Sequence, residues 1–252
     1  MIPRPLEVFF SRHPSVYARL LRWTGRGNLE KRVFLTLLRR GNVIFDIGAN
    51  HGHFTRLFSD IAGPHGSVDA FEPNPVTYRA LEQMIKSTAH FKNYRLHHSA
   101  LGDKEGAATL YQPGNDDGQV SLRQHTHGSW EKPSAVIEHE CKVARLDDEA
   151  RPLTRLDFIK CDVEGAELPV LRGATETLAR LSPVLFLEVA ACWTQAFDYQ
   201  PSDLVEFLYA AGYRHFYVAD GSVRPFQRGQ EIVGSVNLVC AKNDAVTHVL
   251  EA

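Results

Sequence analysis

The sequence predicts an α/β protein in which a mainly parallel sheet is covered by helices. Residues 43–47 form a largely apolar, β-branched run, which is typical of a strand buried on both faces. Gly48 and Gly52 follow this run. Four apolar residues then have the spacing of an amphipathic helix that packs on the sheet: Phe54, Leu57, Phe58 and Ile61. A strand, a glycine turn and a helix in this order are the plan of a nucleotide-binding unit.

Length and composition indicate one globular domain. The chain has 252 residues, of which 44% are hydrophobic and 23% charged, and no apolar run is long enough to span a bilayer. The four cysteines are far apart and form no Cys-x-x-Cys pair, so neither a zinc site nor a redox dithiol is expected. Reduced, buried thiols favour a cytoplasmic protein.

Charge is distributed unevenly and suggests two parts, a basic N-terminal helical extension over residues 1–41 and the main domain over residues 42–252. The net charge is −2, yet residues 1–40 carry nine lysines and arginines against two acids. Val16 and Leu20 mark one helix, and residues 33–38 mark a second that ends at Gly41. We expect a solvated cap on the sheet edge. Contact with an anionic membrane surface and closure over an acidic acceptor are the alternatives.

The first turn favours a cationic ligand over a dinucleotide. The dinucleotide fingerprint needs glycine at its third and sixth positions, which here are Asn50 and His53. Asp46, at the end of the strand, would repel a pyrophosphate and attract a cation. S-adenosylmethionine fits, because it carries an ammonium and a sulfonium. The candidate residues of this turn are Asp46, Gly48, Ala49, Asn50, Gly52 and Phe54.

Two further strand ends complete the expected cofactor site. Glu72 follows a strand over residues 67–71, where a carboxylate can accept both ribose hydroxyls of an adenosine, and Pro73 adjoins it. A third strand over residues 94–100 places Ser99 and Ala100 beside the adenine ring.

An insertion over residues 106–146 follows the third strand. Residues 106–112 and 136–146 alternate as strands, with residues 120–122 as a third candidate, and polar segments separate them. So long a polar insertion in a compact domain is usually functional or mobile. We expect a lid over the acceptor site, with a mobile surface loop as the alternative.

The second half of the chain supplies more acidic strand ends. Strands are expected over residues 156–162, 183–189, 213–218 and 236–241, and the last should be antiparallel because no helix precedes it. A helix should follow the first of them over residues 168–181. Asp162, Glu164 and Glu188 then face the acceptor.

Asp162 is the first candidate for a base or orienting group, and Glu164 the second. As an alternative, Glu164 and Glu167 lie at a helix start, where amides stabilise carboxylates without catalysis. Asp162 and Glu188 could also hold Mg²⁺, a second choice because no third ligand is evident, so no metal residue is assigned. The pairs His51 with His53 and His125 with His127 are weaker base candidates.

The motifs together resemble a known family. The chain contains D-I-G-A-N, F-E-P-N-P and D-V-E-G-A-E after successive strands, and in this it resembles class I S-adenosylmethionine-dependent methyltransferases of the FkbM type over about residues 43–239. His53 and Cys161 depart from the usual pattern. The resemblance implies a Rossmann-like, doubly wound sheet of seven strands in the order 3-2-1-4-5-7-6. It also implies methyl transfer mostly to oxygen on sugars, lipids or polyketides.

Rival functions use the same fold. A nicotinamide-dependent oxidoreductase would need glycines that the turn lacks, and a non-catalytic binding module would keep the fold without turnover. The acidic body and the absence of Asn-Pro-Pro-Tyr argue against nucleic acid as a partner. We therefore expect a small-molecule, glycan or lipid acceptor. A homo-oligomer is compatible with the sequence.

Overall fold

The computed structural model describes residues 9–10, 13–24, 28–88, 92–114 and 116–250. Residues 1–8, 11–12 and 25–27 of the expected N-terminal extension, residue 115 of the expected lid and residues 251–252 of the main domain lie outside this description. The strands of the main sheet are β1 (Val43–Ile47), β2 (Ser67–Phe71), β3 (Tyr94–His97), β7 (Phe158–Cys161), β8 (Val184–Ala190), β9 (His215–Asp220), β10 (Ser222–Pro225) and β11 (Ser235–Ala241).

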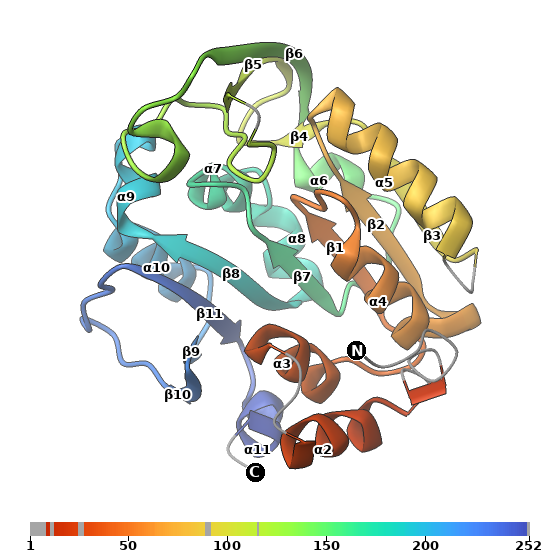
Figure 1. The fold of residues 1–252 in the computed structure, drawn as a ribbon. Helices are drawn as coiled ribbons and strands as arrows, with labels where there is room; N and C mark the ends of the chain where they lie inside the picture. The colour runs from red at the N-terminus through yellow and green to blue at the C-terminus, as the bar shows by residue number, and fades with distance from the viewer. Residues whose placement is uncertain (1–8, 11–12, 25–27, 89–91, 115, 251–252) are drawn as a thin grey trace.

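The main sheet has the expected mixed topology (Figure 1). Its order is β3-β2-β1-β7-β8-β11-β9-β10, with parallel pairing from β3 to β8. β11 runs antiparallel to both β8 and β9. The order 3-2-1-4-5-7-6 is therefore present over seven strands. β10 is an eighth, unexpected strand that pairs with β9 at the edge.

Helices cover both faces of this sheet. They are α2 (Pro14–Thr24), α3 (Leu29–Leu37), α4 (His53–Ala62), α5 (Pro75–Thr88), α6 (Leu146–Glu149), α7 (Glu167–Arg172), α8 (Thr175–Leu181), α9 (Ala191–Thr194), α10 (Pro201–Ala210) and α11 (Thr247–Leu250), with 3₁₀ turns at Gly63–His65, Gly128–Trp130, Gln195–Phe197 and Asp244–Val246. None of the helices in the described ranges combines the length and apolarity needed to cross a membrane.

The α3 helix lies on a face of the sheet, not at its edge. Phe34 is fully buried, and its ring packs edge-on against Phe58 of α4, Phe158 of β7 and Phe186 of β8. These are central strands, so the expectation of a cap on the sheet edge is wrong. In α2 the buried side chains are Tyr17, Ala18 and Leu21, whereas Val16 is exposed.

A second, three-stranded sheet forms the insertion. Its order is β4-β6-β5, from β4 (Ala100–Leu101), β5 (Gly106–Pro113) and β6 (Val136–Ala144). The expected third strand of the main sheet ends at His97, because Ala100 pairs with Val143 of β6 instead. The third candidate strand of the insertion is reduced to one bridge between Ser121 and Tyr111.

The single helix expected over residues 168–181 is divided into α7 and α8. At the break, a Cβ atom on Gly173 would lie 2.0 Å from the carbonyl oxygen of Gly102, which follows β4. The small sheet therefore approaches the helix layer closely at this point. The small sheet and the helix layer of the main domain are therefore in direct contact.

Candidate active site

The carboxyl ends of the parallel strands border one cavity, called the main cavity here. It brings together nine of the residues that the sequence predicts for cofactor or acceptor: Gly48, Asn50, Glu72, Pro73, Ser99, Ala100, Asp162, Glu164 and Glu188. A second hollow, the side cavity, is lined by Gly48, Ala49, Asn50, His51, His53, Phe54, Lys160 and Asp162. Asp46 and Gly52 line neither cavity.

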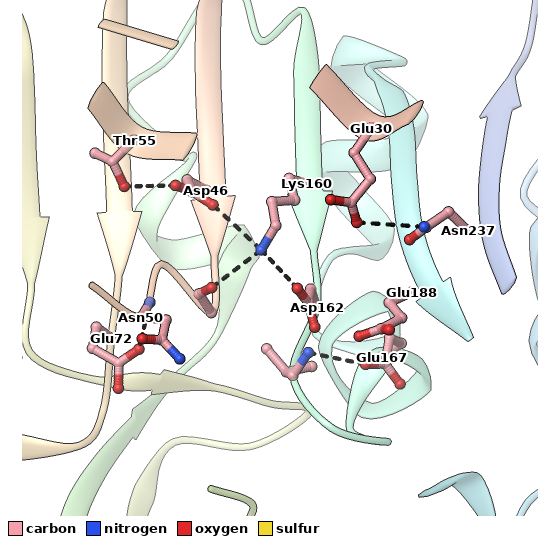
Figure 2. A network of polar contacts seen from close by, with 12 residues as sticks. Glu30, Asp46, Asn50, Thr55, Glu72, Lys160, Asp162, Glu167, Glu188 and Asn237 are labelled. Carbon is pink, nitrogen blue, oxygen red and sulfur yellow. Dashed lines mark hydrogen bonds and ion pairs between the residues drawn. The ribbon is translucent and has the colours of Figure 1, made fainter. Parts of the chain in front are cut away.

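Glu72 is held in place by the two turns beside it. One carboxylate oxygen accepts from the backbone amide of Asn50 at 2.8 Å (Figure 2). The other accepts from the backbone amide of Asn74 at 2.9 Å. Burial raises the pKa of Glu72 to about 7, against the effect of these amides. A carboxylate has about four acceptor sites, so the ionised group can still accept from a ligand diol.

Asp46, expected to face the cofactor, points away from both cavities. Its side chain is fully buried, accepts from the hydroxyl of Thr55 at 2.6 Å and lies 3.7 Å from the ammonium of Lys160. Burial raises the pKa of Asp46, while Lys160 opposes this. The reason is the strand alternation, which turns Asp46 toward α4 and away from the main cavity.

The glycines of the first turn serve packing. A Cβ atom on Gly48, whose φ is +75°, would lie 1.9 Å from the carbonyl oxygen of Asp162. One on Gly52 would lie 2.4 Å from Leu81 Cδ1 of α5. Gly48 thus allows the two strand ends to approach, and Gly52, which lines neither cavity, allows α5 to approach.

Three carboxyl groups meet at the other end of the main cavity. Asp162, Glu164 and Glu188 each place an oxygen within 4.8 Å of the others. Glu164 is therefore the candidate for the third oxygen ligand that sequence reasoning did not find. Its φ of +52° is in the left-handed region, a strained conformation that often occurs at functional sites.

The three groups differ in pKa. Burial would raise the pKa of Asp162, but Lys160 holds it below its usual range. Burial and then the charge of Asp162 raise the pKa of Glu164 to about 8 and also raise that of Glu188. The helix-start alternative fits Glu167, since its carboxylate accepts from the amides of Val163 and Gly165.

The insertion forms part of the wall of the main cavity. Asp117, Gly118, Val120, Ser121 and Leu122 line it. The hydroxyl of Ser121 donates to the carbonyl of Glu164 at 3.0 Å, and the amide side chain of Asn50 donates to the carbonyl of Asp117 at 3.4 Å. Residues 116–122 therefore bridge the two loops at the strand ends, as a lid does.

The two histidine pairs lie in different parts of the structure. His125 is buried among Trp130, Trp193 and Phe197, and burial lowers its pKa to about 4. Neither of its ring nitrogens has a hydrogen-bond partner in the described ranges. It lines neither cavity and instead packs the insertion against α9 and the 3₁₀ turn that follows it. His51 and His53 line the side cavity.

Lys160 is the main residue that sequence reasoning missed. It is buried within β7, and its ammonium lies 3.1 Å from the carboxylate of Asp162 and 3.1 Å from the carbonyl of Gly48. The available signal was a lysine inside a strand that is otherwise apolar, directly before an acidic strand end.

Comparison with known proteins identifies the family. Residues 46–215 match the family model "Methyltransferase FkbM domain". The chain is 32% identical to the 2-O-methyltransferase NoeI of Sinorhizobium fredii, over 59% of this chain and 64% of that protein. It is 30% identical to the 31-O-demethyl-FK506 methyltransferase FkbM of Streptomyces tacrolimicus, over 55% of this chain and 62% of that protein.

A solved structure agrees in fold. The methyltransferase FkbM of Methylobacillus flagellatus superimposes with a TM-score of 0.50 at 13% identity, over 85% of this chain and 55% of that chain. The chain thus spans less than two thirds of the length of these relatives. The matched segment includes the strand ends that carry Asp46, Glu72, Asp162 and Glu188. The chain belongs to the FkbM methyltransferase family.

Proposed function

We propose that this chain is a methyltransferase that uses S-adenosylmethionine to methylate a hydroxyl oxygen of a small molecule. The observation that carries the proposal is the main cavity, which runs from Glu72 after β2 to Glu188 at the end of β8. Family membership supports the reaction, and two relatives are named as O-methyltransferases. The acceptor class we favour is a sugar, lipid or polyketide alcohol.

The residues fit this donor. Glu72 offers free acceptor sites to a ribose diol, and Pro73, Ser99 and Ala100 continue the same wall. Asp162 supplies negative charge where two strand ends meet, which favours a cationic ligand. When bound, the donor supplies an electrophilic methyl group. The chain's own part is to hold the acceptor oxygen close to it and in line, which can account for ~7 to 11 kcal/mol of the barrier at best.

The acceptor hydroxyl must also lose a proton. Once ionised, Glu164 and Glu188 suit this role better than Asp162, because a carboxylate with a raised pKa, here about 8 and about 9, takes up a proton more readily. At neutral pH only the minor, ionised fraction of each group can accept the proton. Asp162 shares its carboxylate with Lys160 and is the better orienting group. This ranking reverses the order that the sequence suggested.

A magnesium-dependent version is the second candidate. The meeting of three carboxyl groups favours it, since Mg²⁺ takes oxygen ligands. The ammonium of Lys160 beside Asp162 competes with a cation there. Methyl transfer that stops with a chelator and returns with Mg²⁺ would support this version.

Calorimetry tests the proposal directly. We expect the protein to bind S-adenosylmethionine and not NAD, and then to transfer a labelled methyl group to a member of a panel of sugar, lipid and polyketide alcohols. Binding of NAD alone would support the oxidoreductase. Donor binding without any transfer would support a non-catalytic module.

The free cysteines among the described residues support a reducing compartment, for which we propose the cytoplasm.

A further inference from the structure

Lys160 is a charged side chain in an otherwise apolar layer. All four residues of β7 are buried, and the side chain of Lys160 is only 4% exposed. It lies on the same face of the sheet as Phe158, which packs against Phe34 of α3 and Phe58 of α4. Lysine is almost never fully buried unless it is paired, so its partners should explain its presence.

The partners of Lys160 come from separate segments that meet at the cavities. Its ammonium donates to the carbonyl of Gly48 in the first turn at 3.1 Å and to the carboxylate of Asp162 after β7 at 3.1 Å. It is 3.7 Å from the carboxylate of Asp46 (Figure 2). It is also 5.8 Å from the ring centre of Phe54. Gly48 and Asp162 line both cavities.

A third acidic group approaches from outside the family segment. Glu30, in the first turn of α3, accepts from the side chain of Asn237 at 3.4 Å and extends toward Lys160 in Figure 2. Burial and then the charge of Asp162 raise the pKa of Glu30, and Lys160 opposes this rise. Two carboxylates, from β1 and the end of β7, therefore lie 3.7 and 3.1 Å from the ammonium, and a third, from α3, acts on it by charge without a direct contact.

We propose that Lys160 is a positioning residue for donor binding. By bonding Gly48 and Asp162 at once, it fixes the first turn relative to the end of β7 before a ligand arrives. It does not contact the reacting atoms. The inference rests on the proposed function, because it names the residue that shapes the donor site.

Stability alone does not account for this arrangement. Replacing a buried ion pair with apolar groups of similar volume is often neutral or stabilising, whereas removing one partner leaves an uncompensated charge. Lys160→Met alone should therefore destabilise the protein through Asp46. The double variant Asp46→Asn/Lys160→Met removes the fully buried pair. It leaves Asp162 without its partner, but that side chain is 31% exposed and can be hydrated, so the variant should fold nearly as well as the wild type.

The test compares melting temperature with donor affinity, measured by calorimetry with S-adenosylmethionine and S-adenosylhomocysteine. We expect the double variant to melt within about 3 °C of the wild type. Its donor dissociation constants should nevertheless be at least about tenfold larger, the effect of losing a charged hydrogen bond. Lys142→Met, at an exposed lysine of β6, is the matched control and should change neither quantity.

Two outcomes would overturn the inference while leaving the proposed function intact. In one, the double variant binds both ligands within about threefold of the wild type, a change too small for a lost charged hydrogen bond. In the other, the double variant stays as unstable as Lys160→Met, so that folding alone explains the lysine. A wild-type protein that binds neither ligand would instead reject the proposed function, and this inference with it.

Discussion

At the level of single residues, ionisation of the buried carboxyl groups of the candidate site lowers the free energy of unfolding. Burial is the largest cause of the raised pKa of Glu72, Glu164 and Glu188. A carboxyl group with a raised folded-state pKa binds its proton more tightly in the native protein than in the unfolded chain. Its contribution to stability is therefore full below the unfolded pKa of 4.5 and is lost as pH rises toward the folded pKa.

Glu188→Gln should reveal this cost, because glutamine keeps the shape and cannot ionise. We expect the free energy of unfolding of the variant to exceed that of the wild type by about 1–2 kcal/mol at pH 8 and to match it at pH 4.5. Urea denaturation at the two pH values measures the difference. Glu206→Gln is the control, since Arg228 lowers the pKa of this exposed carboxylate and no gain at pH 8 should follow. Equal stabilities at pH 8 would mean that Glu188 is not held against ionisation.

The sequence predicted which strand ends carry the site better than it predicted where each side chain points. Glu72 and Asp162 were found because they directly follow apolar runs, Glu188 because it lies near the end of one, and Glu164 because it follows Asp162 in the same loop. The topology brings these ends to one edge of the sheet. Asp46 lies inside its strand, where successive side chains point to opposite faces of the sheet, so a shift of one residue decides whether a side chain faces the cavity or the interior. When a strand is buried on both faces, no local sequence pattern shows which face a given side chain takes.

At the level of elements, α3 is part of the main core although it precedes the family segment. Phe34→Ala should lower the free energy of unfolding by about 3–5 kcal/mol, because its ring is fully buried among four others. Phe9→Ala is the matched control, since that side chain is 55% exposed and should change stability by less than about 0.5 kcal/mol. Urea unfolding would show the loss in a single transition. If α3 were a separable cap, Phe34→Ala would leave the main transition unchanged.

Element boundaries followed from the sequence where the signals were local. The strands at residues 43–47 and 67–71 were predicted with their observed limits, because glycine or an acid terminates each apolar run. β10 was missed because it has four residues, one of them proline. Ala100 was expected in the main sheet but lies in the small sheet, because it pairs with β6, which is distant in sequence.

Residues 116–122 of the insertion contact the first turn through Asp117, which accepts from Asn50 and faces His51, and substitutions can weaken each contact separately. His51 and Asp117 form an ion pair of 3.4 Å when the imidazole is protonated, and both side chains are exposed to a large extent. Because exposed pairs contribute about 0.2–1 kcal/mol, Asp117→Asn should speed the release of S-adenosylhomocysteine by about two- to fivefold. Stopped-flow displacement measures this rate. Asp103→Asn, at an exposed position outside the lid contacts, should leave it unchanged. An unchanged rate in Asp117→Asn would show that the ion pair does not limit opening.

For the whole molecule, the order of the strands separates the two ends of the main cavity, at which we propose donor binding and proton removal from the acceptor. Glu72 follows β2 and Glu188 lies in β8, and the sequence of neighbours β2-β1-β7-β8 puts three strand spacings between them. At 4.7–4.9 Å per spacing this is about 14 Å, a distance at which substitutions usually act independently. The resemblance to the family could predict this order. Neither composition nor local periodicity could do so, because pairing across a sheet joins distant segments.

The two ends of the main cavity should therefore fail in different ways. Glu72→Ala should weaken donor binding by about tenfold or more, because a ligand diol loses its charged acceptor. Glu188→Gln should keep the donor dissociation constant within about threefold and lower methyl transfer by about a hundredfold or more, the range of a lost general base. Calorimetry and a labelled-methyl assay on the same preparations measure the two quantities, and the double variant should show the product of both losses. The opposite pattern, with donor binding lost in Glu188→Gln and kept in Glu72→Ala, would place the donor at the β8 end of the sheet and require the acceptor to lie over β2.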